Sequence, residues 1–455
     1  MLPKRLKRDL RRRLGEEAVL ETLEDRYVHA FDATAAVALP AIVVVPATVE
    51  ELAWACEALW EAGVATTPRG AGTGYAGGAV PAAGGAVVVC DRLKVIDGPG
   101  EDVVTVEPGV VGDDLNRFLK PAGRFYPVDP ASAEASTLGG HVATNAGGPR
   151  AVKYGVTRDY VLSAEVVSPG RGREVYRSDP GTPDLLSVLV GSEGTLAVFL
   201  RIRLRVTEMP EATAAAVASF AERDRAGEAA NAVLEVVLPS KLEFVDHRCL
   251  ACLNEQEPGA FDETAEAVLM FEFDGARAAV AEELDAAAAL LRAAGALAVD
   301  VASDRKAAEA LWHLRRGISP ALGRLAPHKI NEDVCVPLSQ IPAVLNFIGE
   351  LERRYDVPVP TFGHVGDGNL HVNFMYDRRR AEERERVEAA VGKLMARVVE
   401  LGGTITGEHG VGLVKLPYLG LEQTEAEAAY AARIKGFFDP AGVLNPGKIY
   451  GSPGL

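Results

Sequence analysis

The sequence is poor in cysteine, and the cysteines that it has exclude several kinds of redox centre. There are five, Cys56, Cys90, Cys249, Cys252 and Cys335, an odd and scattered set that favours a reducing compartment. None of the spacings forms a four-cysteine iron–sulfur motif, so electrons that reach this chain need another carrier. The pair in Cys249-Leu-Ala-Cys252 lacks a second pair and is interpreted as two ordinary thiols.

Long apolar runs and excess positive charge are missing as well. No stretch approaches the roughly 18–20 apolar residues that cross a bilayer, and no apolar core of a signal peptide follows the basic N-terminus. We therefore expect a cytoplasmic protein without a transmembrane segment. A formal net charge of −16 argues against a nucleic-acid partner. With 455 residues, 48% of them hydrophobic and 25% charged, the chain should form two or three globular domains.

The N-terminal stretch combines leucines at every fourth position with a run of cations. Leu2, Leu6, Leu10 and Leu14 recur at helical spacing, which predicts an amphipathic helix. We expect the leucine face to pack on the chain's own domain. Peripheral contact with an anionic membrane surface, such as the inner membrane, is the alternative. The basic residues are Lys4, Arg5, Lys7, Arg8, Arg11, Arg12 and Arg13.

Residues 363–371 (GHVGDGNLH) lie between two strand-like runs, 357–362 and 370–376. Asp367-Gly368 at the centre predicts a hairpin with a two-residue type I′ turn. In that register His364 lies directly opposite His371, with Cβ atoms about 4.5–5.5 Å apart. Two imidazoles so placed can hold one metal ion. Two histidines on a polar sheet face are the alternative.

A second histidine-containing segment, Thr406-Gly-Glu-His-Gly410, supplies a carboxylate in a glycine-rich loop. Two histidines and one glutamate with an open position form a recurring catalytic zinc arrangement, and imidazole suits other divalent metals too. The sequence therefore predicts a divalent metal site at His364, His371 and Glu408, with zinc as the expected ion. A flavin-free metallohydrolase fits this donor set, because such sites also activate water.

Three glycine-rich segments, 68–78, 129–148 and 191–196, occupy the first half of the chain. Glycine permits positive φ and close backbone approach, and successive amides in such loops bind anions. The first segment is not the Rossmann fingerprint, because its GxGxG spacing is wrong and no acidic partner follows. Together the three loops predict a large, extended, anionic cofactor, although a single glycine loop is often only a turn.

The pattern of apolar and polar residues changes near Glu208-Met-Pro210, where we place the boundary between the two domains. Beyond it, helical stretches alternate with strand-like runs, and two β-α-β passages predict an antiparallel, ferredoxin-like second domain. The helical stretches are 221–236, 276–294 and 380–401, and the strand-like runs are 241–245, 267–273, 296–301 and 370–376.

Six motifs follow one another along the chain: PRGAGTG, STLGGHVATNAGG, GSEGTLAV, GHVGDGNLH, GEHGVG and DPAGVLNPGK. In this combination, the region from about Tyr27 to Lys448 resembles the FAD-linked 2-hydroxy-acid dehydrogenases of the vanillyl-alcohol oxidase superfamily. That group includes D-lactate dehydrogenases, D-2-hydroxyglutarate dehydrogenases and the flavin subunit of glycolate oxidase. The resemblance implies an α+β fold: a vanillyl-alcohol-oxidase-type FAD-binding domain with the N-terminal helix (1–208), a ferredoxin-like substrate or cap domain with the metal-binding hairpin (209–405), and a segment that returns to the FAD domain with the catalytic loop (406–455).

The resemblance also implies which residues contact FAD. Some relatives attach the flavin through a histidine in the first loop, where this chain has Ala71, so we expect non-covalent FAD. His141 lies in the second loop and receives no role. The implied contacts are Pro68, Arg69, Gly70, Ala71, Gly72, Thr73, Gly74, Gly77, Pro130, Ser136, Thr137, Gly139, Gly140, Thr144, Asn145, Gly147, Gly148, Tyr154, Gly155, Glu193, Gly194, Val198 and Asn445.

For the reaction, the resemblance implies that His409 is the catalytic base and that Arg315 and Lys329 bind the substrate carboxylate. Arg316 rivals Arg315, and without the family a surface ion pair would be the simpler interpretation of both cations. The metal binds the substrate's hydroxyl and carboxylate, the metal lowers the hydroxyl pKa, and hydride passes to the flavin. The expected substrate is a D-2-hydroxy acid, D-lactate or a near relative.

Several alternatives remain open from the sequence. Within the family, the chain could be a glycolate oxidase flavin subunit or a D-2-hydroxyglutarate dehydrogenase. A non-enzymatic flavoprotein would explain the glycine loops but not the histidines. The electron acceptor is expected to be external: a quinone, a cytochrome, an electron-transfer protein or an iron–sulfur subunit. A homodimer also stays open.

Overall fold

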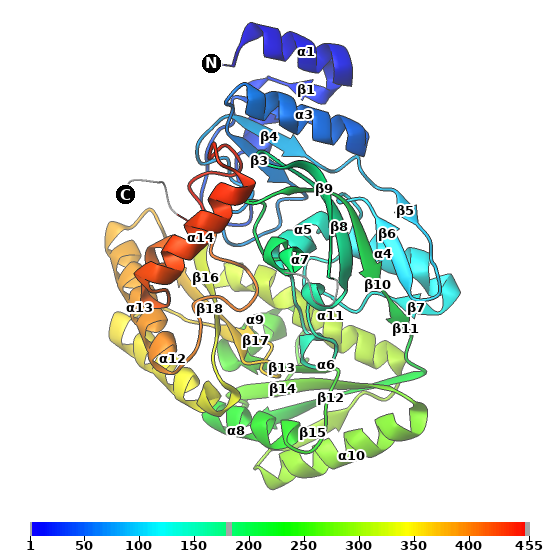
Figure 1. The fold of residues 1–455 in the computed structure, drawn as a ribbon. Helices are drawn as coiled ribbons and strands as arrows, with labels where there is room; N and C mark the ends of the chain where they lie inside the picture. The colour runs from blue at the N-terminus through cyan, green and yellow to red at the C-terminus, as the bar shows by residue number, and fades with distance from the viewer. Residues whose placement is uncertain (1, 179–183, 451–455) are drawn as a thin grey trace. The chain divides into compact units, whose positions relative to one another are not determined.

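The computed structural model describes residues 2–178 and 184–450, which form two compact units. The first unit comprises Met1–Gly147, Val156–Met209 and Glu408–Leu455, and the second comprises Gly148–Gly155 and Pro210–Gly407. Both units combine helices with β-sheet, so the predicted α+β class is confirmed (Figure 1). The short passage Gly148–Gly155 within the second unit had no counterpart in the sequence prediction.

A small sheet with strand order β1-β2-β4-β3 begins the first unit. Helix α3 (Val49–Glu61) is capped by Thr48, whose side chain accepts a hydrogen bond from the Glu51 amide. Helices α1 (Lys4–Leu14) and α3 lie against each other, and the leucines of α1 join the core of this sheet, as predicted (Figure 1). The strands are β1 (Val19–Leu20), β2 (Ile42–Val44), β3 (Thr66–Arg69) and β4 (Ala86–Val89).

A second, antiparallel sheet of the first unit has the order β5-β6-β10-β8-β9. Apolar residues of β8 and β10 form its core with the fully buried Tyr126 and Leu138. Its strands are β5 (Ile96–Asp97), β6 (Val103–Val106), β8 (Val161–Ser168), β9 (Gly172–Arg177) and β10 (Val198–Arg205); β7 (Arg124–Phe125) pairs with β11 (Thr207–Glu208). The remaining helices of the unit are α2 (Leu23–Val28), α4 (Gly112–Leu119), α5 (Leu138–Thr144), α7 (Leu185–Leu189) and α14 (Glu425–Phe438).

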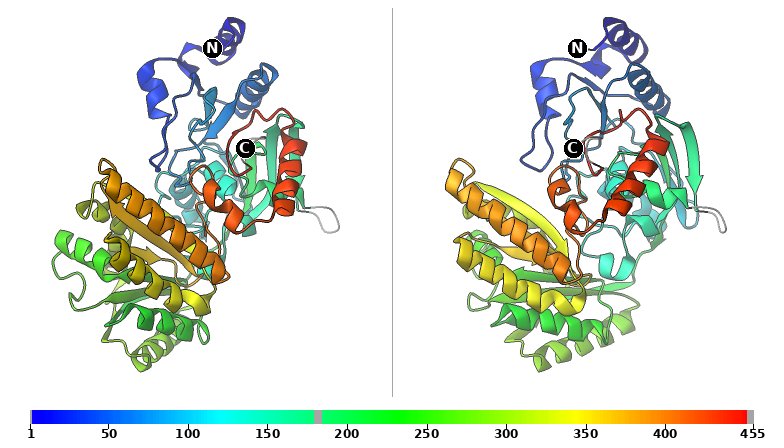
Figure 2. Two further views of the ribbon diagram at one scale, coloured as in Figure 1. Left: turned by 90° about the vertical axis from the view of Figure 1, so that its left-hand side faces the viewer. Right: turned by 60° about the vertical axis from the view of Figure 1, so that its left-hand side comes forward.

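The second unit is built on a seven-stranded antiparallel sheet of order β15-β12-β14-β13-β17-β18-β16. Helices α8, α10, α12 and α13 cover one face, and α9 and α11 pack on the other (Figure 2). The strands are β12 (Ala212–Phe220), β13 (Lys241–Asp246), β14 (Ala267–Gly275), β15 (Ala298–Val301), β16 (His328–Cys335), β17 (Thr361–Gly363) and β18 (Asn369–Tyr376). The helices are α6 (Ala151–Tyr154), α8 (Arg223–Leu234), α9 (His247–Gln256), α10 (Arg277–Ala293), α11 (Arg305–Ala321), α12 (Ile341–Tyr355) and α13 (Ala381–Glu400).

The connection between β17 and β18 differs from the predicted hairpin. Phe362, not His364, lies opposite His371. Gly368 has a φ of +84°, but Asp367 does not adopt the positive φ that a type I′ turn needs at both positions. A longer loop, residues 364–368, forms because the Gly366 amide donates to the carbonyl of Leu242 on β13, at 3.1 Å. The predicted register was wrong because a tertiary contact, not local turn preference, decides this connection.

Candidate functional site

The three glycine-rich segments come together within the first unit. The first begins at the end of β3, the second contains α5, and the third precedes β10. A Cβ on Gly70 would lie 2.2 Å from Oγ1 of Thr137, in the second segment. A Cβ on Gly412 would lie 2.0 Å from the carbonyl oxygen of Ala76, in the first. At Gly412 the two backbones therefore approach so closely that only glycine fits, and at Gly70 a larger residue would clash with the Thr137 hydroxyl.

Buried polar side chains tie the loops to the C-terminal segment of the first unit. The Glu193 carboxylate accepts hydrogen bonds from the amides of Val411 (2.7 Å) and Gly412 (2.8 Å). The Asn445 side chain donates to the carbonyls of Gly78 and Glu193, both at 3.0 Å. Burial raises the pKa of Glu193 to about 7. The Asn445 side chain thus joins the first and third loops to each other, and the Glu193 side chain joins the third loop to Val411 and Gly412.

Lys448, which the sequence reasoning did not single out, belongs to the same network. Its Nζ donates to the Gly78 carbonyl at 2.6 Å and to Oδ1 of Asn445. Burial lowers the pKa of this lysine to about 7. The only sequence signal was its place at the end of the NPGK motif.

The residues expected to contact FAD divide between the units. Arg69 is buried at the end of β3, where Nη1 donates to the carbonyl of Phe31 at 2.7 Å. Gly148, Tyr154 and Gly155 lie in the second unit. There the Tyr154 hydroxyl donates to Asp274 at 2.8 Å. The others, from Pro68 to Gly77, Pro130 to Gly147, Glu193 to Val198, and Asn445, lie in the first unit.

The structure brings His364 and His371 together in spite of the changed register. Both side chains are buried, and their Nε2 atoms are 3.4 Å apart. The rings are 5.0 Å apart between centroids and nearly perpendicular, at 89°. Two imidazole nitrogens therefore converge on one point, which is the arrangement that a shared metal ion requires.

Glu243, which the sequence reasoning missed, holds one of these histidines in place. It is fully buried on β13, and its Oε1 lies 2.6 Å from Nδ1 of His364. Burial alone would raise the pKa of Glu243, but the charges of and hydrogen bonds from Arg315 and His364 outweigh it and lower the pKa to about 2. A carboxylate on Nδ1 leaves Nε2 to face a metal, as in many metal sites.

Arg315 is the second partner of this carboxylate. It lies on α11, and its Nε donates to Oε2 of Glu243 at 2.7 Å, with Nη2 on the same oxygen. Arg315 is buried, whereas its rival Arg316 is exposed. The ion pair of Arg315 is therefore an interior pair, unlike the surface pair weighed from the sequence.

Glu408 completes the predicted donor set. It follows Gly407, whose amide donates to the Asp333 carboxylate on β16 at 3.0 Å. Ligand atoms of His364, His371 and Glu408 all lie within 4.8 Å of one another. Two imidazoles and a carboxylate fit a divalent ion with one coordination position left for a water or substrate oxygen.

Lys329 lies on β16, on the sheet face that also carries His371. The register places Asp333 opposite His371 and Asn331 opposite Asn373, so alternate residues of β16 line this polar face. Nζ of Lys329 donates to Oγ of Ser319, and burial lowers the pKa of this lysine. Lys329 thus presents a partly desolvated ammonium group from the same face.

Two histidines of the first unit differ in their surroundings. His409 stacks on Tyr75 of the first glycine loop, with ring centroids 5.0 Å apart and planes at 28°. His141 is buried on α5, with Nε2 2.8 Å from Oγ of Ser136. Burial lowers the pKa of His141 to about 4, which suits a neutral structural histidine.

The cysteines agree with the sequence prediction. All five cysteines are free, and burial raises the pKa of both Cys249 and Cys252, as expected of unreactive thiols. Across residues 2–178 and 184–450, no helix has the length and apolarity needed to cross a bilayer.

Comparison with known families matches most of the chain. Residues 40–176 match an FAD binding domain, and residues 209–449 match the C-terminal domain of FAD linked oxidases. The chain is 35% identical to the glycolate oxidase subunit GlcD of Bacillus subtilis, over 99% of this chain and 97% of that protein. It is 33% identical to a D-lactate dehydrogenase of Anaerostipes hadrus, covering 90% of each chain. Identity with a D-2-hydroxyglutarate dehydrogenase of Stutzerimonas stutzeri is 31%, over 90% of this chain and 91% of that protein.

Solved structures share the fold at low sequence identity. A 4-ethylphenol oxidase from Gulosibacter chungangensis superposes with a TM-score of 0.78 at 15% identity, covering 99% of each chain. p-Cresol methylhydroxylase gives 0.77 at 14% identity, over 99% of this chain and 98% of the other. The predicted vanillyl-alcohol-oxidase architecture is thereby confirmed. The matches to FAD domains and to the curated relatives set aside the flavin-free hydrolase and the non-enzymatic flavoprotein. The chain belongs to the FAD-linked oxidase family, and it is an oxidoreductase with FAD as its cofactor.

Proposed function

We propose that this protein oxidises a D-2-hydroxy acid, D-lactate or a close relative, to the 2-keto acid. FAD serves as hydride acceptor, and a divalent metal, with zinc expected, is held by His364, His371 and Glu408. The observation that carries the proposal is the buried pair of His364 and His371, in which Glu243 lies 2.6 Å from Nδ1 of His364 and fixes the orientation of that ring. Such a donor set in an FAD-linked oxidase supports metal-assisted activation of a hydroxyl group.

The cofactor fits the first unit. When bound, FAD supplies the two-electron acceptor for the substrate hydride. The glycine loops offer backbone amides to its pyrophosphate, and positive φ at Gly72 (+71°) and Gly77 (+82°) turns the first loop sharply. Ala71 provides no nucleophile for a covalent link, so the flavin is proposed to bind non-covalently.

Cations and the metal site would recognise the substrate together. A divalent ion held by His364, His371 and Glu408 would lower the pKa of a bound hydroxyl group. Arg315 and Lys329 neutralise the substrate carboxylate. Among the described residues, Glu243 engages Nε and Nη2 of Arg315, so Nη1 is the donor that a carboxylate would use.

We assign the base role to His409. Histidine is the side chain whose ordinary pKa lies nearest neutral pH, so it can take a proton from a metal-activated hydroxyl through an imidazole nitrogen. Its stacking on Tyr75 keeps the ring beside the first glycine loop, where FAD is expected.

A glycolate oxidase flavin subunit is the second candidate. It is favoured by the 35% identity to GlcD, which is named as a subunit. In that case electrons would leave through a partner protein such as an iron–sulfur subunit. For the first candidate, a quinone, a cytochrome or an electron-transfer protein would serve, and D-2-hydroxyglutarate is a third substrate to test.

Anaerobic mixing tests the proposal. Purified protein is combined with D-lactate, L-lactate, glycolate and D-2-hydroxyglutarate in turn, and the visible flavin bands are followed. We expect bleaching by a D-acid, loss of bleaching after chelator treatment, and recovery on adding zinc. Bleaching by glycolate alone would favour the second candidate. A yellow protein that no 2-hydroxy acid bleaches, or bleaching that chelators leave unchanged, would contradict the proposal.

A further inference from the structure

The N-terminal helix α1 concentrates positive charge in a strongly negative protein. Its sequence, KRLKRDLRRRL, contains seven basic residues and one aspartate, a net charge of +6. Because the whole chain carries −16, the rest carries −22. Charges separated by more than about 8 Å are screened at physiological ionic strength, so what approaches α1 responds mainly to the helix itself.

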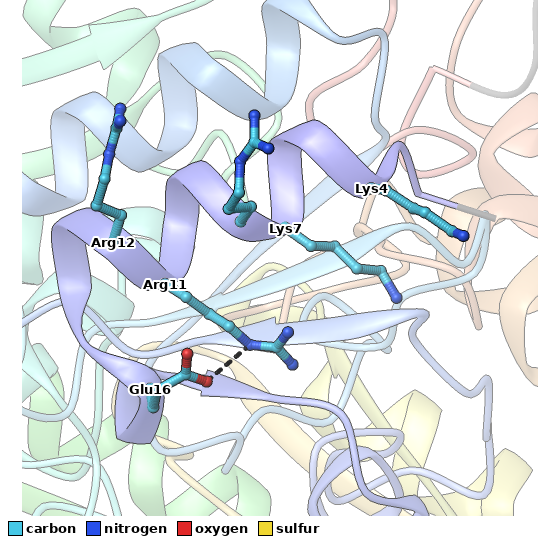
Figure 3. Close-up of a pocket in the computed structure, with 6 residues that line it drawn as sticks. Lys4, Lys7, Arg11, Arg12 and Glu16 are labelled. Atoms are coloured by element: carbon cyan, nitrogen blue, oxygen red, sulfur yellow. Dashed lines mark ion pairs between the residues drawn. The ribbon is translucent and has the colours of Figure 1, made fainter.

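The packing of α1 turns this charge outward. Leu6, Leu10 and Leu14 are buried in the core that α1 shares with α3. The opposite side of the helix is therefore left to the cations. Lys4, Lys7 and Arg11 project to one side of α1, next to an open depression of about 520 Å³ (Figure 3). The depression is lined by Lys4, Lys7, Arg8, Arg11, Arg12 and Glu16.

Only part of this charge is neutralised within the protein. Lys7 and Arg11 both form ion pairs with Glu21, and Arg11 also reaches Glu16 at 3.0 Å. Asp9 is shared between two arginines at 3.7 and 3.6 Å. Within the described ranges, no carboxylate pairs with Lys4 or Arg8. Both side chains belong to exposed residues, so their charges face solvent.

Exposed apolar side chains follow directly in the chain. Glu21, which anchors α1 through its ion pairs, is followed by the cap Thr22 and by α2, which contains no buried residue. On α2, Leu23 is 61% exposed, Tyr27 56% and Val28 55%. The loop that follows exposes Val37 (58%) and Leu39 (38%). Helix α1 and its successor therefore present cations and protruding apolar groups from neighbouring stretches.

We propose that α1 and α2 dock this protein on an anionic lipid bilayer. Basic residues near a charged membrane surface attract acidic headgroups, and leucine, valine and tyrosine side chains enter the interface beside them. A bilayer accepts separate protruding side chains of this kind, whereas a protein partner needs a complementary surface for each. The surface holds the protein peripherally and does not depend on the identity of the substrate.

Vesicle co-sedimentation of the full-length flavoprotein tests the proposal. The vesicles contain one part phosphatidylglycerol to two parts phosphatidylcholine, and pure phosphatidylcholine vesicles serve for comparison. We expect binding to the mixed vesicles that weakens as salt is added. The variant Lys4→Gln/Arg8→Gln/Arg12→Gln should bind about 100-fold more weakly, because each cation near the surface contributes about fivefold.

A matched control removes the same charge elsewhere. Lys306, Arg384 and Lys393 are exposed cations of α11 and α13, and Lys306→Gln/Arg384→Gln/Lys393→Gln should bind the vesicles like the unaltered protein. The apolar part is tested by Leu23→Gln/Val28→Gln, which should weaken binding severalfold even in high salt. Flavin content and substrate-driven bleaching should stay unchanged in all three variants.

Three results would overturn the proposal. One is failure of the unaltered protein to sediment with the acidic vesicles. Another is an equal loss of binding in both triple variants, which would mean that only net charge matters. The third is a protein that ignores vesicles but is retained on immobilised polyglutamate through Lys4, Arg8 and Arg12, which would assign the surface to an acidic protein.

Discussion

The glycine loops of the first unit and the sheet face of the second unit that carries His371 position their functional groups by different means. In the loops, backbones approach so closely that a Cβ on Gly412 would lie 2.0 Å from a carbonyl oxygen. On the sheet face, side chains from β13, α11 and the β17–β18 connection meet around the carboxylate of Glu243. A site formed by closely packed backbones does not tolerate any added side-chain volume at its glycine positions. A site formed by side chains depends instead on individual functional atoms, such as the carboxylate oxygens of Glu243.

The largest effect is expected from His409→Ala, which removes the proposed base and leaves the loops intact. Flavin reduction by substrate should slow about 10²- to 10⁴-fold, the usual contribution of a general base, while FAD content stays normal. Rapid-mixing spectroscopy under anaerobic conditions measures the rate. His313→Ala, at an exposed position of α11, is the control. Reduction at the normal rate would remove His409 from the base role.

The buried ion pair of Glu243 and Arg315 tests how far the sheet face of the second unit depends on single charged groups. Glu243→Leu leaves Arg315 buried without its partner, so we expect a loss of about 3–5 kcal/mol in the free energy of unfolding. Glu243→Leu/Arg315→Leu removes both charges and should recover much of that loss. Urea unfolding measures both variants. If the double variant is as unstable as the sum of the single ones, the two side chains do not act as a pair.

His141 is, like Glu193, a buried side chain of the glycine loops whose pKa is shifted by burial. Burial lowers its pKa to about 4, so between pH 4 and an unfolded value near 6.5 the unfolded state binds a proton that the folded state lacks. Stability is therefore lost as pH falls through this window, by about 3 kcal/mol in total. His141→Gln should flatten this dependence in pH-resolved unfolding, and His313→Gln should not. An unchanged profile in His141→Gln would contradict the assignment.

The smallest effect is expected from a substitution in the closely packed glycine loops of the first unit. Gly412→Ala places a methyl group against the carbonyl oxygen of Ala76 at a φ of +48°, so we expect FAD affinity to fall about tenfold or more. Gly436→Ala is the matched control, since no atom lies within 4 Å of its added Cβ. Flavin fluorescence titration measures both. Equal affinities would mean that the contact between the first loop and the C-terminal segment does not shape the cofactor site.

The same contrast explains what the sequence could predict. Glycine loops are recognisable because the glycines themselves are the structural requirement, and the long helices α8, α10 and α13 follow from periodicity. The histidine pair was found for a partly wrong reason, because its hairpin register depends on Gly366 bonding to β13. Glu243 was missed, since its partners lie 72 and 121 residues away. Its only local signal was an acidic residue in the middle of the strand Lys241–Asp246, which is charged at both ends as well.

The central claim is that His364, His371 and Glu408 hold one divalent metal. Metal analysis of the purified protein, followed by zinc titration after chelator treatment, tests it most directly. We predict one ion per chain, bound again after stripping, and loss of that ion in His371→Ala with FAD retained. His313→Ala should keep the metal. A His371→Ala protein with the full metal complement, or an unaltered protein that takes up none, would contradict the account.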